Sequence, residues 1–174
     1  MVSNTAISTT YEVGDYAQGG VVFYVDETGE HGLVCGTNNF GPHPWTSGSY
    51  YRMDAIADGV YAGKMNTAII VANVGYNGGN WYAANGCSTW SNSGPVEFGD
   101  WYLPANWELQ EMYNNKEIIN STSIANGGEA FVDEYYWNST ELGTDYAYAR
   151  HMGTGTSNFR EKHLEYVYRP IRSF

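Results

Sequence analysis

The residues that most often bind metals in proteins are present, but their spacing does not form a metal-binding motif. None of the four histidines has a second histidine four positions away, the spacing that places two imidazoles on one face of a helix. Glu97 and Asp100 could pair on a calcium ion, although carboxylates at such spacing more often hold a loop by accepting backbone N–H bonds. We therefore expect no metal and no cofactor. The histidines are His31, His43, His151 and His163.

Motifs for nucleophilic catalysis and phosphate binding are also missing from the sequence. There is no Gly-x-Ser-x-Gly segment, and Gly153-Thr154-Gly155 precedes a strand-like run, which indicates a turn and not a phosphate-binding loop. Cys35 and Cys87 are the only cysteines and form no Cys-x-x-Cys motif. We favour two buried thiols, and a single disulfide is the alternative in an oxidising compartment. The sequence therefore does not predict an enzyme.

Charge is distributed unevenly along the chain, and this directs attention to the C-terminal residues. The net charge is −11, which argues against a nucleic-acid partner because phosphate contacts need an extended basic face. Residues 150–174 nevertheless carry five Lys or Arg side chains against two Glu. A basic, aromatic and loop-rich end on an acidic body predicts a ligand-binding surface in that region.

The overall composition favours one β-rich domain. A chain of 174 residues fits a single domain with a sizeable core, and 21 glycines suit many tight turns. We expect a lead-in or attachment arm over residues 1–15 and one ligand-binding domain over residues 16–174. No apolar run is long enough to cross a membrane. The first residues lack the basic and apolar regions of a signal peptide. We nevertheless expect an extracellular or virion-surface protein, whose signal was removed or whose export follows another route.

The first half of the chain predicts a hairpin, a loop and a helix. Val21–Val25 and Gly32–Cys35 read as strands joined by a turn at Asp26–Glu30. Phe40–Tyr51 is rich in Gly, Pro and aromatic residues and predicts a loop. A helix is expected to start at Asn66-Thr67, where either side chain could cap it, and to end near Gly75. This segment is apolar nearly all round, so the helix should be buried.

The second half predicts one further helix and the strands that complete the domain. Ala105–Lys116 places Leu109, Met112 and Tyr113 on one apolar stripe, and Pro104 suits a helix entry. Residues 118–133 read as a polar connector. The closing run Tyr166–Arg172 alternates as a half-buried strand does. We count two helices and at least five short strands, with no internal repeat.

Several segments, in this order, resemble the signature segments of one family. The chain is identified as a member of the Lcl C-terminal-domain-like family, which is similar in fold to C-type lectins. The resemblance runs from Gln18 to the final residue. The segments that carry it are Gln18–Tyr24, Gly99–Pro104, Glu108–Tyr113, Tyr136–Glu141 and Val167–Phe174.

The resemblance implies an α+β domain with a C-type-lectin-like fold, with two helices, short antiparallel strands and neighbouring chain ends. Members occur on bacterial surface adhesins, in phage fibres and among variable proteins of diversity-generating retroelements, where C-terminal residues are varied to change the ligand. The calcium-dependent sugar motif of true C-type lectins is absent, so neither calcium nor sugar specificity is implied. Members often carry Ser where Ala105 stands. Ala105 cannot cap the helix, and Asn106 is expected to replace it.

The resemblance also separates core from surface in the C-terminal part. Positions 148 and 152 resemble a buried aromatic and a buried apolar residue, and Trp101, Trp107, Trp137 and Phe174 are expected in the core. Tyr, Arg, Asn and His offer large contact area and adaptable hydrogen bonds, which suits a binding patch. The expected ligand-binding residues are Tyr146, Arg150, His151, Asn158, Arg160, His163 and Tyr166. The alternative location is the aromatic loop around His43, Trp45 and Tyr50.

These observations predict a non-enzymatic ligand-binding protein, a receptor-binding or adhesion module whose partner is a protein or glycan on another cell surface. An oligomer is possible, and membrane insertion is not expected. The alternative is a structural fibre or virion component without an external ligand. A relative of the formylglycine-generating enzymes is a further alternative, but those enzymes use a cysteine pair in the C-terminal half, and no cysteine follows Cys87 here.

Overall fold

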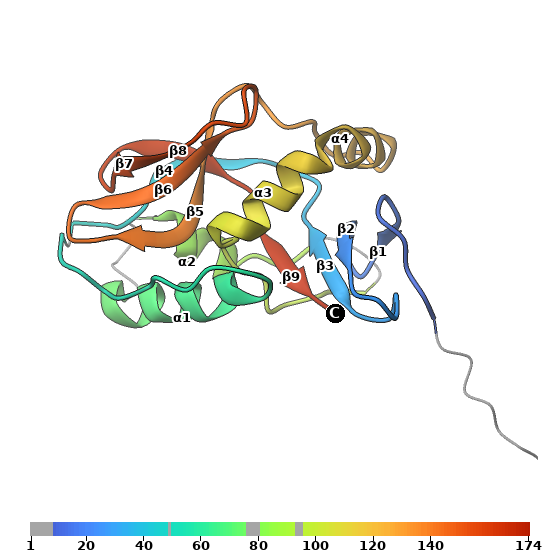
Figure 1. Ribbon diagram of the computed structural model, residues 1–174, viewed down its shortest axis with the longest axis horizontal. Coiled ribbons are helices and arrows are strands. Elements are labelled where there is room, and N and C mark those ends of the chain that lie inside the picture. The colour runs from blue at the N-terminus through green and yellow to red at the C-terminus, as the bar shows by residue number, and fades with distance from the viewer. Residues whose placement is uncertain (1–8, 49, 76–80, 93–95) are drawn as a thin grey trace, which may run out of the picture.

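The computed structural model describes residues 9–48, 50–75, 81–92 and 96–174. Within these residues the chain is a mixed α+β domain with four helices and nine strands in two sheets (Figure 1). The two sheets lie side by side, with one helix running diagonally across them and another along the lower edge of the view. The α+β prediction is therefore confirmed, whereas the prediction of two helices is wrong. None of the helices in the described part of the chain is long and apolar enough to cross a membrane.

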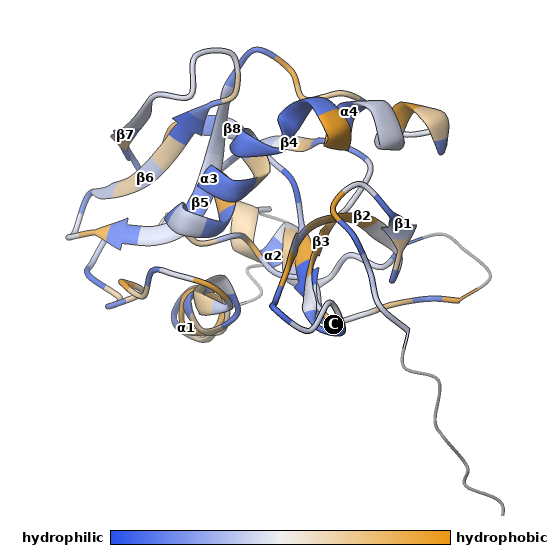
Figure 2. Ribbon diagram, turned by 45° about the vertical axis from the view of Figure 1, so that its right-hand side comes forward, coloured by the Kyte–Doolittle hydropathy of each residue, from blue (hydrophilic) through white to orange (hydrophobic). Residues whose placement is uncertain are grey.

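The smaller sheet holds the predicted hairpin and both ends of the described chain. Its order is β1-β2-β3-β9, all antiparallel. Hydrophobic residues are concentrated in β2 and β3 (Figure 2). The turn between them forms because Asp26 Oδ1 accepts hydrogen bonds from the backbone N–H groups of Thr28 and Gly29, as Asp does in Asx-turns. The strands are β1 (Tyr16–Ala17), β2 (Gly20–Val25), β3 (Gly32–Cys35) and β9 (Ile171–Ser173).

The residues before β1 are already attached to this sheet. Gly14 N donates to Val22 O, and Val22 N donates to Asp15 O. The rings of Tyr11 and Phe174 meet edge to face with centroids 4.9 Å apart. The expected lead-in over residues 1–15 thus includes residues that pack on the domain, and the C-terminus lies beside Tyr11.

The larger sheet is built mainly from the C-terminal third of the chain. Its order is β4-β8-β5-β6-β7, in which β5 and β8 are parallel and the other neighbours are antiparallel. The strands are β4 (Phe40–Pro44), β5 (Tyr135–Leu142), β6 (Tyr146–His151), β7 (Ser157–Glu161) and β8 (Glu165–Tyr168). The loop predicted over Phe40–Tyr51 therefore begins with a strand, which pairs with β8 from the far end of the chain.

The closing run Tyr166–Arg172 is two strands and not the single strand that was predicted. Tyr168 ends β8 in the larger sheet, and Ile171 starts β9 in the smaller one. Pro170 has no backbone N–H, so it cannot continue a ladder. The side chain of Arg169 is turned inward, where Nη2 donates to Asn39 Oδ1 at 2.7 Å and to Glu129 O at 2.9 Å. The four residues from Tyr168 to Ile171 are all buried, so the run does not alternate between buried and exposed positions as predicted.

Helix α1 (Ala62–Val74) starts four residues earlier than predicted, and α2 (Ala83–Ser88) was not predicted. Asn66 and Thr67 lie inside α1 and are buried. Their polar atoms bond other segments: Asn66 donates to Ala57 O, and Thr67 Oγ1 accepts from Leu103 N. Met65 is 63% exposed, so α1 is buried on one face only. The prediction that this helix is buried nearly all round is therefore wrong. Its end at Gly75 is confirmed, with a backbone φ of 72°.

Helix α3 (Asn106–Asn114) confirms the predicted helix, with Leu109 and Met112 buried on its apolar stripe. The prediction that Asn106 caps this helix is wrong. Asp58 Oδ1 accepts a hydrogen bond from Trp107 N at 2.7 Å, and Thr140 Oγ1 accepts one from Asn106 N at 3.0 Å. The helix start is thus capped from distant segments.

Helix α4 (Lys116–Ala125) occupies much of the predicted connector 118–133. Ile119 and Ser123 are its buried residues, and the small number of apolar positions explains why the sequence pattern did not indicate a helix.

The core consists of clusters that join the sheets to the helices. One surrounds Trp45 and Trp137, and another surrounds Phe23 and Tyr136. Of the aromatic residues expected in the core, Trp101 and Trp137 are buried, whereas Trp107 and Phe174 are partly buried. Cys35 and Cys87 are free and buried in different clusters, which confirms the interpretation as two packed thiols. Burial raises the pKa of the Cys35 thiol to about 11.

Candidate binding site

The positive charges of the C-terminal region are mostly inside the protein. Arg150 is 4% exposed, and Lys162 and Arg169 are 0% exposed. Arg150 Nη1 donates to Gly155 O at 2.6 Å, and its Nε is buried without a hydrogen-bond partner in the described residues. Burial lowers the pKa of the Arg150 guanidinium. The prediction that Arg150 is exposed is therefore wrong.

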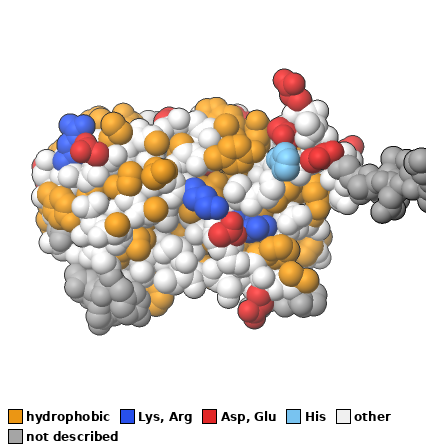
Figure 3. All heavy atoms as spheres, turned by 90° about the horizontal axis from the view of Figure 1, so that it is seen from below, with side chains coloured by type: hydrophobic (Ala, Val, Ile, Leu, Met, Phe, Trp, Pro, Cys, Tyr) orange, Lys and Arg blue, Asp and Glu red, His pale blue; other side chains and the backbone are white. Residues whose placement is uncertain are grey.

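The other two Arg side chains of this region also have partners. Arg172 Nε lies 2.9 Å from Asp100 Oδ1, and Asp100 also pairs with Lys64 at 3.3 Å. Arg160 lies over the ring of Tyr135, 4.2 Å from its centroid. On the face seen in Figure 3, the Lys and Arg side chains lie beside acidic ones, and most of the remaining surface is uncharged. The basic binding surface expected from the charge distribution is therefore absent from the described residues.

Asp100, which the sequence suggested as one half of a calcium pair with Glu97, forms ion pairs in the structure. Its carboxylate bonds two basic side chains, and not the loop backbone that was expected. No group of three or more potential metal ligands occurs among the residues that the structure describes. Asp100 therefore serves as a structural ion-pair residue between α1 and β9.

The strand register distributes the predicted binding residues over both faces of the larger sheet. Residues paired across antiparallel strands share a face, and Tyr146 pairs with Glu161 whereas Ala147 pairs with Arg160. Arg150 pairs with Ser157, whose Oγ donates to Asn106 Oδ1 of α3, so α3 covers that part of the first face. The predicted set therefore does not form one patch.

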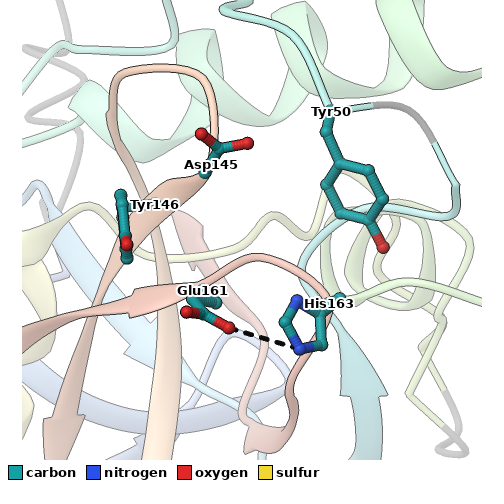
Figure 4. A pocket seen from close by; sticks show the side chains of 5 residues that line it. All are labelled: Tyr50, Asp145, Tyr146, Glu161 and His163. Carbon is teal, nitrogen blue, oxygen red and sulfur yellow. Dashed lines mark ion pairs between the residues drawn. The ribbon is translucent and has the colours of Figure 1, made fainter.

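One part of the set lines a cavity of about 310 Å³, which we call the C-terminal pocket (Figure 4). Its residues come from four places: the loop after β4, the β5–β6 turn with the start of β6, the end of β7, and the β7–β8 turn. The side chains gather around an open space in the close view. The residues are Tyr50, Asp145, Tyr146, Glu161 and His163.

The contacts inside the C-terminal pocket are polar and aromatic. His163 Nε2 lies 3.4 Å from Glu161 Oε2, and both side chains are about half exposed. The ring of Tyr50 stands at 84° to that of His163, with centroids 6.4 Å apart. Tyr146 packs edge to face on Phe159, at 5.4 Å. Two carboxylates and two phenol rings can bind a donor group or a cation, and the described residues contribute no Lys or Arg to the lining.

A second part of the set forms a cluster around Tyr135, which we call the tyrosine–arginine cluster. Tyr135 contacts the rings of His151 and Tyr166, with centroids 4.8 and 5.4 Å away, and carries Arg160 on its face. Burial raises the pKa of the Tyr166 hydroxyl and Arg160 opposes this, so the hydroxyl stays protonated at neutral pH. Asn158 is exposed on β7 and belongs to neither group.

Three residues of the C-terminal pocket were not among the predicted binding residues. Asp145 follows Gly143-Thr144 in a turn, and Glu161 is the last residue of β7, beside the charged residues Arg160 and Lys162, so their exposure could have been inferred from the sequence. Tyr50 belongs to the alternative aromatic loop, and nothing in the sequence indicates that it meets His163. Trp45 of the same loop is 0% exposed and cannot contact a ligand.

A scan against protein-family models gives no match for this chain, and no curated protein is significantly similar to it.

Proposed function

We propose that this protein is a non-enzymatic binding module that holds its ligand at the C-terminal pocket. The observation that carries the proposal is that Tyr146 and His163, two of the predicted binding residues, line an exposed cavity together with Tyr50 from a distant loop. Tyr50 is 47% exposed, Tyr146 37% and Phe159 53%. Large aromatic side chains that stay in water in the unbound protein are the usual anchors of protein interfaces.

The charge of the C-terminal pocket indicates the chemistry of its ligand. Asp145 and Glu161 are acidic, and the protein as a whole carries −11. Because Arg150 is buried and Arg160 is stacked on Tyr135, neither offers a free cation to an acidic target. The ligand is therefore expected to present hydrogen-bond donors or basic groups, and binding should weaken as salt is raised.

The motifs quoted from the sequence support a C-type-lectin-like scaffold, and the resemblance supports a role in receptor binding or adhesion. Such a module would be displayed at an extracellular or virion surface and would contact a protein or glycan on another cell. A variable protein of a diversity-generating retroelement is one form of this proposal. A near-copy of the C-terminal coding sequence beside a reverse transcriptase gene would identify it.

The competing proposal is a structural fibre or virion component, and it is favoured by the apolar side chains that the surface exposes outside the pocket, such as Ile124 and Val96, both 59% exposed. The two proposals differ in whether the C-terminal pocket is free in the assembled particle. Labelling of Tyr50 and Tyr146 by a tyrosine-specific reagent on intact particles distinguishes them, since a structural component would have the pocket covered.

The direct test is binding of the purified protein to a panel of candidate host cells, measured by flow cytometry. The variant Tyr146→Ala/His163→Ala should remain folded and lose binding by roughly tenfold or more, because a few anchors carry most interface energy. Tyr16→Ala is the matched control, since Tyr16 is 52% exposed on β1, in the other sheet. Equal binding by the double variant and the control would show that the ligand is held elsewhere.

A further inference from the structure

Five aromatic rings line a second cavity, which we call the aromatic pocket. Its volume is about 320 Å³, at the lower end of the range of roughly 300–1,000 Å³ that is typical of small-molecule sites. The rings come from β4, β8 and the segments on either side of α2, and the pocket shares no lining residue with the C-terminal pocket. They are Phe40, His43, Trp81, Trp90 and Tyr168.

The rings are held in a defined arrangement. His43 and Trp81 are nearly parallel, at 21°, and so are Phe40 and Tyr168, at 22°. His43 Nδ1 lies 3.0 Å from the hydroxyl of Tyr168. A Cβ at Gly86 of α2 would lie 2.0 Å from that hydroxyl, so only glycine allows Tyr168 to approach the helix this closely. Trp81 is 45% exposed, which leaves the pocket open to a ligand.

The charges around the aromatic pocket are negative or neutral. Among the residues that the structure describes, no Lys or Arg lines it, and neither β4 nor α2 contains one. Glu165 starts β8 and pairs with Pro44, next to His43. Burial lowers the pKa of the His43 imidazole, and the charge of Glu165 offsets part of this effect. His43 is therefore neutral near pH 7. Arg169 follows Tyr168 in sequence, but its guanidinium bonds Asn39 in the interior.

We propose that the aromatic pocket binds an alkylated ammonium group, of the kind carried by choline and by methylated lysine. Aromatic faces attract such a cation through their negative electrostatic potential, and its methyl groups pack on the rings without requiring hydrogen bonds. The absence of a basic side chain from the described lining favours a cation over an anion. The described lining offers an anionic ligand no charged partner.

The test is titration of the full chain with choline and, separately, with free Nε-trimethyllysine, followed by the indole N–H resonances in NMR spectra. Trp81→Phe and Trp90→Phe assign the two resonances. Both should shift saturably with at least one of the two cations, and the tighter of the two identifies the natural source of the group. The neutral isostere 3,3-dimethylbutan-1-ol should bind about tenfold more weakly, since it lacks the charge.

A substitution in the lining tests whether the cation is held in this pocket. Trp81→Ala should weaken choline binding by about fivefold. Tyr16→Ala, which removes an exposed ring on β1 of the smaller sheet, should leave it unchanged. Equal affinity for choline and its neutral isostere would overturn the proposal, and so would the lack of a saturable shift with both cations.

Discussion

Lys162 Nζ lies 2.6 Å from Glu141 Oε1, and both side chains are completely buried. The ammonium also donates to the backbone oxygens of Gly143 and Thr144, while Glu141 accepts from the backbone N–H groups of Met53 and Asp54. One ion pair thus joins the β5–β6 turn, the turn after β7 and the loop that follows Tyr50. Glu161 and His163, on either side of Lys162 in sequence, line the C-terminal pocket. The buried Lys162–Glu141 pair therefore holds the turn that carries the half-exposed Glu161–His163 pair.

Replacing Lys162 by Met should destabilise the protein strongly, because it leaves the Glu141 carboxylate buried without its counter-charge. Loss of one partner of a buried pair typically costs about 3–5 kcal/mol of unfolding free energy. Urea denaturation measures this. Lys64→Met is the matched control, since its pair with Asp100 is about half exposed and should contribute less than about 1 kcal/mol. Similar losses for both variants would contradict the role assigned to Lys162.

The stability of the protein should decrease between about pH 4.5 and pH 7 because of Glu108. Burial is the largest influence on this carboxyl and raises its pKa from 4.5 to about 7, against hydrogen bonds from Ala105 N, the Tyr102 hydroxyl and Gly63 N. The folded state therefore holds a proton that the unfolded state releases, and stability falls as pH rises through this window by up to about 1.4 kcal/mol per pH unit.

Glu108→Gln should flatten this pH dependence, because an amide keeps an acceptor for the backbone N–H groups and does not ionise. Thermal unfolding of both proteins at several pH values is the measurement. Parallel curves for the two proteins would show that Glu108 ionises in the fold as it does in water.

Leu109→Ala should cost roughly 2–5 kcal/mol of unfolding free energy, because Leu109 is fully buried on α3 between helix and sheet. Ile124→Ala on α4 is the control, since its side chain is 59% exposed and its loss should change stability by about 0.5 kcal/mol or less. An unchanged melting temperature in Leu109→Ala would disprove the packing described for α3.

Arg150 and His163 should respond in opposite ways to alanine substitution. Arg150→Ala should lower the free energy of unfolding by about 1–3 kcal/mol, because Gly155 O loses its partner and a buried space opens. His163→Ala should leave stability within about 0.5 kcal/mol and reduce ligand binding. Chemical denaturation together with the cell-binding assay measures both, and a stable Arg150→Ala variant that fails to bind would return Arg150 to the binding site.

The sequence by itself determined the elements whose signals are local. The hairpin turn at Asp26 follows from an Asx-turn within four residues, and the α3 stripe follows from the spacing of Leu109 and Met112. The end of α1 follows from a glycine that can adopt a positive φ. In each case the residues that decide the conformation are neighbours in the chain, so their types and spacing suffice.

The tertiary structure decided which polar residues are buried and which are exposed. In the sequence, Asn66 resembles a helix cap. In the fold it lies inside α1 and donates a hydrogen bond to Ala57 O, in the segment before the helix. In the sequence, Lys162 is expected to be a surface charge. In the fold it is buried, where Glu141 and the residues of two turns surround it. A charged side chain is buried only where partners compensate its lost hydration. Those partners come from segments distant in sequence, which is why the C-terminal region reads as basic in the sequence and presents an acidic, tyrosine-lined pocket in the fold.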